Sequence, residues 1–380
     1  MKLTGDWLQR SETQQVCALL QAAGFAALVV GGSVRNALLG MAVADVDIAT
    51  DAVPEMVSDL AEMAGLRVVP TGIRHGTVTV LVGQESYEVT TFRQDLQTDG
   101  RHAVVGFGAS LAEDAARRDF TINALYAQAD GTVIDPLGGL PDLMARRVRF
   151  VGDPAARIRE DYLRILRFFR FYATHGDPDQ GIDARGLTAC AALSAGIDTL
   201  SRERIGVEMR KLLAAPDPAP AVAAMAAAGV LAQVLPGADA TALAVLVHLE
   251  NGAPPDWLRR LLVLGGDDPT DALRLGRAEQ RDWLLLRNLI GGAEGPAELG
   301  YRHGAALATH TLLLRATMFK ADLPPDWQIA MARGAAARFP VTAADLMPAL
   351  QGPALGARLA GLENAWIESD FTLTRDQLLQ

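Results

Sequence analysis

Gly31-Gly32-Ser33-Val34-Arg35-Asn36-Ala37-Leu38-Leu39-Gly40 is the stretch that decides the fold, together with Asp45-Val46-Asp47-Ile48-Ala49-Thr50, which follows it. The glycines stand between an apolar run, 27–30, and a helix-like segment, 34–39. This order predicts a strand, a tight turn and a helix start. Paired glycines let the backbone approach a phosphate, helix-start amides favour an anion, and Arg35 could add a charge-assisted contact. The alternative is a turn that needs glycine for its shape alone.

Asp45 and Asp47 lie two positions apart in residues 43–48, where they alternate with Val46 and Ile48. Side chains at i and i+2 of a strand point to the same face, so the pattern predicts two convergent carboxylates. Mg²⁺ in phosphoryl transfer takes such oxygen ligands and keeps substrate phosphates in its shell. Taken alone, a pair at this spacing also fits a solvated turn.

Strand and helix signals interleave up to about residue 140, and beyond it only helix signals continue. This pattern predicts an α+β fold in which a mixed-sheet catalytic head, residues 1–140, precedes a helical neck, 141–215, and a helical body and tail, 216–380. The local expectations are a strand at 27–30, a strand at 43–48, a hairpin from 77–82 and 86–92, a loop at 94–110, and helices at 54–64, 158–175 and 201–214.

Further segments occur in a fixed order along the chain. They read Arg117-Arg118-Asp119-Phe120-Thr121-Ile122-Asn123-Ala124, then Asp135-Pro136-Leu137-Gly138-Gly139-Leu140-Pro141-Asp142-Leu143, then Glu160-Asp161-Tyr162-Leu163-Arg164-Ile165-Leu166-Arg167, and finally Ser201-Arg202-Glu203-Arg204-Ile205 with Glu208-Met209-Arg210-Lys211-Leu212-Leu213. With the glycine and aspartate motifs, this set resembles the polymerase-β-type nucleotidyltransferases, specifically the class II branch of bacterial CCA-adding enzymes and poly(A) polymerases. The resemblance covers about residues 25–215.

The resemblance implies roles for individual residues. Asp45 and Asp47 would be the catalytic residues and would hold Mg²⁺, the implied cofactor. Contacts to the incoming nucleotide would come from Gly32, Arg35, Arg118 and Asp119, the last two near its ribose and phosphates. Arg118 and Asp119 could instead form a purely structural ion pair.

Residues 157–170 are expected to form one helix on which Arg157, Asp161 and Arg164 share a stripe. The resemblance implies that Asp161 and Arg164 pair with the base edge of the nucleotide as a protein template. A carboxylate accepts from an exocyclic amine and a guanidinium donates to a ring acceptor, which suits cytosine and adenine. Further family positions correspond to Arg167 and Arg170. A plain salt bridge one helical turn long is the alternative for Asp161 and Arg164.

Two residues and one segment need separate mention beside the resemblance. Asn36 replaces the aspartate that the family commonly has after the arginine of the glycine motif, which leaves the support of Arg35 in question. Glu88 alternates with apolar residues and fits either a third carboxylate near the metal or an ordinary strand residue. The short segment 99–107 resembles the flexible loop of CCA-adding relatives, whereas a poly(A) polymerase would carry a longer insertion there and a basic tail.

Composition narrows the class of protein. The 380 residues are half apolar, and two cysteines, Cys17 and Cys190, lack metal-ligand spacing. There is no signal-like N-terminus and no long apolar run, so we expect a reduced, cytoplasmic protein without a membrane partner. The net charge of −10 argues against coating a nucleic acid, but residues 144–170 contain eight arginines against three acids. A solvated helix face is the alternative for that run.

The leading interpretation is therefore a CCA-adding tRNA nucleotidyltransferase that transfers CMP and AMP from CTP and ATP to the tRNA 3′ end. We expect those nucleotides and tRNA as partners, and not DNA. A poly(A) polymerase, or an enzyme that adds only C or only A, is the alternative within the enzyme class. A catalytically dead nucleotide- or RNA-binding module is the alternative outside it.

Overall fold

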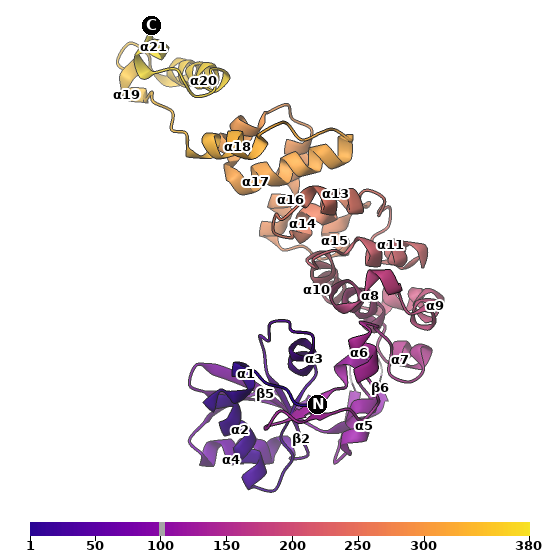
Figure 1. Cartoon of the computed structure of the whole chain (residues 1–380). Coiled ribbons are helices and arrows are strands. Elements are labelled where there is room, and N and C mark those ends of the chain that lie inside the picture. Colours follow the sequence, from indigo (N-terminus) through magenta and orange to yellow (C-terminus); the bar gives the residue numbers. More distant parts are fainter. Residues whose placement is uncertain (99–102) are drawn as a thin grey trace. The chain divides into compact units, whose positions relative to one another are not determined.

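The computed structural model describes residues 1–98 and 103–380, and its chain divides into two compact units. One unit holds Met1–Ala238 with Asp271–Arg274, and the other holds Asp239–Thr270 with Leu275–Gln380. The first contains the whole mixed sheet followed by helices, and the second is helical (Figure 1). The expected α+β class, with a mixed-sheet head followed by helices, is confirmed.

The described residues of the head form a seven-stranded sheet in the order β3-β4-β5-β2-β1-β8-β9. Its strands are β1 (Leu28–Val30), β2 (Asp47–Thr50), β3 (Arg67–Gly72), β4 (Thr77–Val82), β5 (Glu85–Thr91), β8 (Tyr126–Gln128) and β9 (Val133–Ile134). β2 and β5 run parallel, and the other neighbouring pairs run antiparallel. The expected hairpin is present as β4 and β5.

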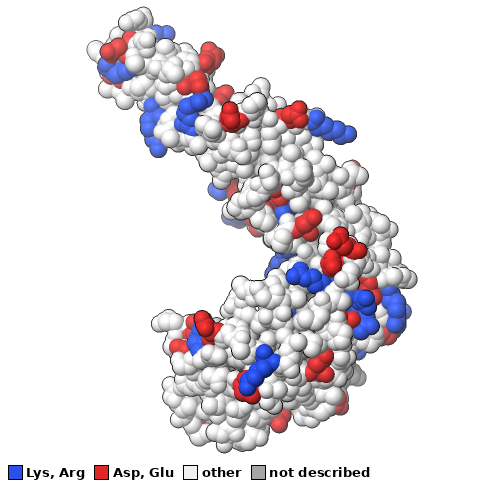
Figure 2. All heavy atoms as spheres, in the orientation of Figure 1, with Lys and Arg blue, Asp and Glu red and all other residues white. Residues whose placement is uncertain are grey.

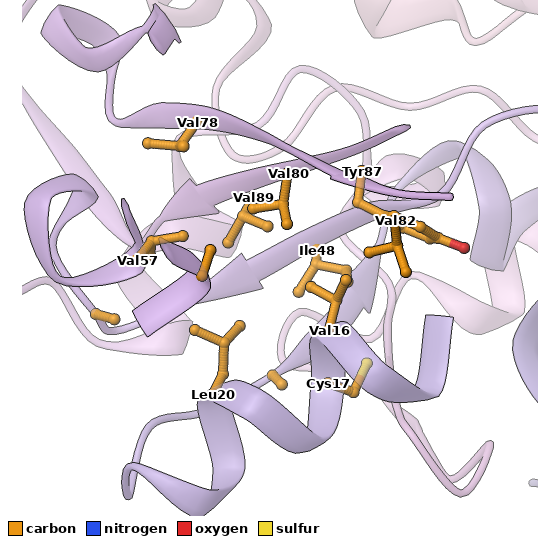
Figure 3. Packing of buried hydrophobic residues seen from close by; sticks show 13 residues of the cluster. Val16, Cys17, Leu20, Ile48, Val57, Val78, Val80, Val82, Tyr87 and Val89 are labelled. Atoms are coloured by element: carbon orange, nitrogen blue, oxygen red, sulfur yellow. The ribbon is translucent and has the colours of Figure 1, made fainter. Parts of the chain in front are cut away.

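Period-2 alternation explains how one face of this sheet is buried. In β4 the valines at positions 78, 80 and 82 are buried and the residues between them are half-buried. They pack with Ile48 and with two helices, α2 (Ser11–Ala22) and α4 (Pro54–Met63), as Figure 3 shows. Burying one such side chain contributes roughly 1.5–3 kcal/mol, so this layer holds the strands that carry the acidic residues in register.

The opposite face of the sheet packs against the segments that bear the Arg-Arg-Asp motif. Its buried cluster includes Val30, Ala49, Ala115 and Tyr126. Ala115 belongs to α5 (Leu111–Ala116), which begins with a complete capping box from Ser110 and Glu113. This packing brings the Arg117-Arg118-Asp119 segment to the end of β1, where the glycine turn lies.

The remaining elements of the first unit are short helices around and after the sheet. They are α1 (Asp6–Gln9), α3 (Gly32–Leu38), α6 (Leu140–Met144), α7 (Pro154–Glu160), α8 (Leu163–His175), α9 (Ala184–Ala192), α10 (Arg202–Leu213), α11 (Ala219–Ala227) and α12 (Val230–Val234), with 3₁₀ turns η1 (Ile73–His75), η2 (Thr121–Asn123), η3 (Pro178–Gln180) and η4 (Ser194–Thr199). Helices expected at 54–64 and 201–214 are present within a residue or two of those bounds.

Three local expectations were wrong. The helix expected over 158–175 is broken, because Asp161 has extended dihedral angles (φ −156°, ψ 108°) between α7 and α8. The strand expected at 43–48 starts only at Asp47, so Asp45 precedes it. The loop expected at 94–110 contains an antiparallel ribbon of β6 (Arg93–Thr98) and β7 (Ala103–Phe107), while its residues 99–102 lie outside the described part of the chain.

The second unit is built from helices around several apolar clusters. Its helices are α13 (Leu243–Glu250), α14 (Trp257–Leu264), α16 (Arg277–Ile290), α17 (Pro296–Phe319), α18 (Trp327–Ala336), α19 (Ala343–Leu346), α20 (Gly352–Glu368) and α21 (Arg375–Leu379), and α15 (Pro269–Ala272) lies at the boundary of the two units. One cluster contains Leu299 and Leu312, and another contains Leu362 and Trp366. Among the described residues, no helix is both long and apolar enough to cross a membrane.

Candidate active site

The glycine motif forms the turn between β1 and α3. Gly31 has a positive φ of 71° (ψ −117°), a conformation that favours glycine, and its amide donates to the Leu125 carbonyl over 3.1 Å. A Cβ on Gly31 would lie 3.5 Å from Nη1 of Arg118. The turn therefore requires glycine for its backbone and brings an arginine from another segment to its edge. Gly32 begins α3.

Asp47 lies beside the end of β1 that leads into this turn, where it pairs with Val30, and two further carboxylates act on it. Asp47 is the first residue of β2, and the parallel register places Glu88 of β5 directly opposite it. Burial, followed by the charges of Glu88 and then Asp45, raises the pKa of Asp47 to about 6, while Arg118 acts in the other direction. Asp45 is thus close to Asp47 although it lies outside the strand, so strand alternation is not what brings this pair together.

The donor chemistry of this cluster fits a hard divalent cation. Burial first, then the neighbouring charges of Glu88 and Asp45, make it harder for Asp47 to ionise, and a bound cation would offset the repulsion between these carboxylates. No group of three or more His, Cys, Asp or Glu side chains among the described residues is arranged to hold a metal. The fit therefore depends on Asp45 and Asp47, and Mg²⁺ commonly uses only one or two carboxylates together with substrate phosphates and water.

Two asparagines hold Arg35, a residue of α3. Its Nε and Nη2 donate to Oδ1 of Asn36 over 3.1 and 2.9 Å, and its Nη1 donates to Oδ1 of Asn123 over 2.5 Å. Asn36 also donates from Nδ2 to the Ala42 carbonyl over 3.1 Å, a bond that an ionised aspartate could not make. Asn36 therefore supports Arg35 and also ties it to the segment that leads to Asp45.

Asp119 links the head to α8. Its buried carboxylate accepts from Nε and Nη2 of Arg167 over 2.8 and 2.5 Å, and from Nδ2 of Asn123 over 2.9 Å. Burial alone would raise the pKa of Asp119, but Arg167 and these hydrogen bonds hold it below its usual value. Nε of Arg170 donates to Glu208 of α10 over 2.5 Å. Asp119 and Glu208 thus fix two arginines of one helix.

Phe171 is the centre of this arginine group. The guanidinium carbons of Arg35, Arg167 and Arg170 lie 5.1, 5.2 and 4.4 Å from the centroid of its ring. Each distance is within the range of a cation–π contact. The aromatic face lets three like charges gather at one place, as a site for a polyanion requires.

Asp161 and Arg164 lie at the break between α7 and α8, each with its own partners. Oδ1 of Asp161 accepts from the Leu163 amide over 3.1 Å, and Oδ2 accepts from Nη2 of Arg204 over 2.7 Å. Arg164 donates to Glu160 over 2.5 Å and to the carbonyls of Arg157 and Arg117 over 2.9 and 3.2 Å. The contact with Arg117 joins this break to the Arg-Arg-Asp segment.

The structure brings the candidate residues into three neighbouring groups in one unit: the acidic cluster, the arginines around Phe171, and the pair at the α7–α8 break. Sequence reasoning missed Asn123, Phe171, Arg204 and Glu208. Arg204 and Glu208 lie in the motif at 201–213, so the motif marked them without indicating a role. Nothing in the sequence indicated a role for Phe171 at the site, because an aromatic residue next to an arginine on a helix is expected to pack in a core.

His175 provides a pH-dependent measure of this packing. It is buried and stacks on Phe171 with ring centroids 5.4 Å apart. Burial first, then the charges of Arg35 and Arg170, lower the pKa of His175 from 6.5 to about 3. When folding lowers the pKa of a basic group, the folded state keeps its full stability at pH values above the unfolded-state pKa. That stability is lost as the pH falls from the unfolded-state pKa towards the folded-state pKa.

Lowering the pH from about 7.5 to about 5 should therefore destabilise the wild type by about 2 kcal/mol more than it destabilises His175→Leu. Urea unfolding of both proteins at both pH values measures this. The exposed His248, replaced in the same way, should give no such difference. An identical pH dependence for His175→Leu and the wild type would contradict the expectation.

Comparisons with known proteins agree with this geometry. Residues 27–149 match the family described as the poly A polymerase head domain, and residues 181–241 match one described as "probable RNA and SrmB- binding site of polymerase A". The chain is 45% identical over 186 residues to CCA tRNA nucleotidyltransferase 1, mitochondrial, of Mus musculus, covering 49% of this chain and 43% of that protein. It is 47% identical over 211 residues to the CCA-adding enzyme of Streptococcus gordonii, covering 54% and 51%.

The matched region spans about half the length of these curated relatives. A solved structure resembles more of the chain: the Bacillus stearothermophilus CCA-adding enzyme in complex with CTP, with a TM-score of 0.75 and 29% sequence identity. That similarity covers 94% of this chain and 93% of the other.

Proposed function

We propose that this chain, which belongs to the family of nucleotidyltransferases containing the CCA-adding enzymes and poly(A) polymerases, adds C, C and A to the 3′ end of tRNA. The observation that carries the proposal is the acidic cluster of Asp47, Glu88 and Asp45 beside a glycine turn to which an arginine is aimed. The named relatives act as CCA tRNA nucleotidyltransferases, and we extend that activity to this chain.

In the proposed reaction the RNA 3′-hydroxyl attacks the α-phosphate of CTP or ATP and pyrophosphate leaves. Asp45 and Asp47 would hold Mg²⁺, which when bound would neutralise charge on the triphosphate and favour deprotonation of the attacking hydroxyl. Glu88, directly beside Asp47, would orient that hydroxyl. Gly32 and Arg35 would contact the nucleotide, and the fixed positions of these groups would supply much of the rate enhancement.

Arg118, Asp119, Arg167 and Arg170 would form the remainder of the nucleotide site. Asp119 and Glu208 pair with Arg167 and Arg170, so the three arginines around Phe171 outnumber these two carboxylates and leave positive charge for the phosphates. This balance supports a site for a triphosphate in a chain whose net charge is −10.

Asp161 and Arg164 would read the base edge. A carboxylate has about four acceptor positions, and Asp161 uses two of them for Arg204 and the Leu163 amide. Acceptor capacity for an exocyclic amine therefore remains without loss of either bond. Arg164 directs three N–H donors to Glu160 and to the two backbone carbonyls named above, and a guanidinium has five, so donors for a ring acceptor remain as well.

The helical part of the chain, residues 216–380, would bind tRNA, with the neck at 141–215 presenting the base-reading residues. On the face drawn in Figure 2, acidic and basic side chains are interspersed among a largely uncharged surface. This favours local contacts to one kind of RNA over binding to arbitrary RNA or DNA. Both cysteines are free and buried, which suits the cytoplasm as the proposed compartment.

The test is the product formed on a tRNA that lacks its 3′ terminus. Purified protein is incubated with this tRNA, Mg²⁺ and CTP, ATP, UTP or GTP, singly and together, and the extended ends are sequenced. Addition of C-C-A and then a stop is the expected result. Long A tails on unrelated RNA would identify a poly(A) polymerase, addition of only C or only A a partial enzyme, and no extension a binding module.

A further inference from the structure

Asp114, in α5, is a buried carboxylate outside the groups described above. Its side chain is 1% exposed and accepts four hydrogen bonds. Two come from Nε and Nη2 of Arg117, over 2.9 and 2.6 Å, one from Nη2 of Arg118 over 3.1 Å, and one from the Tyr126 hydroxyl over 2.7 Å. Although burial acts against ionisation, Arg118 and Arg117 hold the pKa of Asp114 below its usual value.

Tyr126 completes the support of Arg118. Its hydroxyl, which donates to Asp114, accepts from Nε of Arg118 over 3.0 Å. The guanidinium carbon of Arg118 also lies 5.1 Å from the centroid of the Tyr126 ring. Two of the three guanidinium nitrogens of Arg118 are therefore fixed by short bonds, and its plane is restrained by an aromatic face.

The third nitrogen, Nη1, has only a long contact of 3.5 Å to the Asn123 carbonyl. It is also the atom nearest to the place where a Cβ on Gly31 would be. The sheet explains this approach, because Tyr126 of β8 pairs with Val30, the last residue of β1, immediately before the glycine turn. On its other side Val30 pairs with Asp47 of β2. The least satisfied donor of Arg118 thus lies at the glycine turn, directly after the strand position that Asp47 neighbours.

We propose that Asp114 and Tyr126 are positioning residues that hold Arg118 with Nη1 directed at the phosphates of the incoming nucleotide. The inference rests on the proposed function, because that function supplies the nucleotide. Neither residue contacts the nucleotide; both act through Arg118. The network has the chemistry for this task, since an ionised Asp114 orients the guanidinium through Nη2 while Arg117 balances the remaining carboxylate charge, so Arg118 keeps its positive charge for phosphate.

The experiment is a double-mutant cycle on nucleotide affinity, measured with the full chain in the absence of RNA. Tyr126→Phe removes one hydroxyl and keeps the ring. We expect it to weaken CTP binding about tenfold, and to weaken competition by inorganic tripolyphosphate by the same factor, since a hydrogen bond to a charged group is lost. In an Arg118→Ala background, Tyr126→Phe should have no further effect, because a residue that acts through Arg118 loses its influence with it.

Tyr87→Phe is the matched control. Tyr87 is buried in the same sheet, and its hydroxyl shares a 3.1 Å hydrogen bond with Thr13, away from Arg118. It should leave CTP affinity unchanged. Asp114→Asn is a second variant, expected to weaken CTP binding by a similar factor, and Asp114→Glu should restore part of the loss.

Two results would overturn the inference. One is wild-type CTP affinity in Tyr126→Phe, and the other is an equal loss of CTP affinity from Tyr126→Phe in the wild type and in the Arg118→Ala background. Either leaves the proposed function standing, as long as the wild type still forms the CCA product. Conversely, tight CTP binding with the expected cycle but no tRNA extension would refute the proposed function and support this inference. A wild type that binds neither CTP nor tripolyphosphate would overturn both.

Discussion

Asp47→Ala is expected to lower CMP and AMP incorporation by on the order of 10³-fold or more, because loss of a metal ligand removes several kcal/mol of transition-state stabilisation. Asp47 begins a strand whose buried neighbours, Ile48 and Ala49, stay in place, so the fold should remain intact. Single-turnover extension of tRNA measures the rate, and circular dichroism and thermal unfolding measure the fold.

Asp59→Ala provides the control for removal of an acidic side chain from the head. Asp59 is exposed on α4, so this variant should incorporate nucleotides at the wild-type rate. A fully active Asp47→Ala would rule out Asp47 as a metal ligand and with it the proposed reaction centre. The isosteric Asp47→Asn should lose activity to a similar degree, since a neutral amide is a poor ligand for Mg²⁺.

Asp161→Ala is expected to lower the preference for CTP and ATP over UTP and GTP by roughly 10- to 100-fold, which corresponds to the roughly 1–3 kcal/mol of one good base-edge contact. The extension rate with CTP itself should fall less, because the acidic cluster is untouched. The measurement is kcat/KM for each of the four triphosphates on one tRNA.

A change in nucleotide selectivity must be distinguished from a structural disturbance at the break between α7 and α8. Asp161 accepts from Arg204 and from the Leu163 amide, so its loss also weakens local structure. Asp161→Asn keeps the size and one acceptor but replaces the other by a donor, and should shift preference toward UTP and GTP. Asp198→Ala, an exposed acid elsewhere in the same unit, should leave selectivity unchanged. Unaltered selectivity in both Asp161 variants would refute the base-reading role.

Local signals predicted some elements well and others poorly. β4 and β5 were predictable because period-2 alternation and a short turn are local. The break at Asp161 was not, because the apolar periodicity of α8 continues through residues 158–160 and the helical pattern reads as unbroken. At the break Asp161 accepts from the Leu163 amide and from Arg204, which lies 43 positions away, and the second contact has no local signal. The ribbon of β6 and β7 was missed because β6 is mostly polar and neither strand alternates between apolar and polar residues.

The sequence by itself determined the α+β class, the order of the motifs and the positions of the glycines and aspartates, because these depend on backbone preference and on chemistry within a few residues. The turn at Gly31 is one such case, since its positive φ is a local requirement. Only the tertiary structure decided which groups meet. Glu88 lies beside Asp47 through the parallel pairing of β2 with β5. Arg118 reaches the glycine turn because β8 pairs with β1. The arginines converge on Phe171 because two carboxylates from separate segments, Asp119 and Glu208, bind Arg167 and Arg170. Such contacts follow from how the sheet and helices bury their apolar faces together, and no spacing along the chain encodes them.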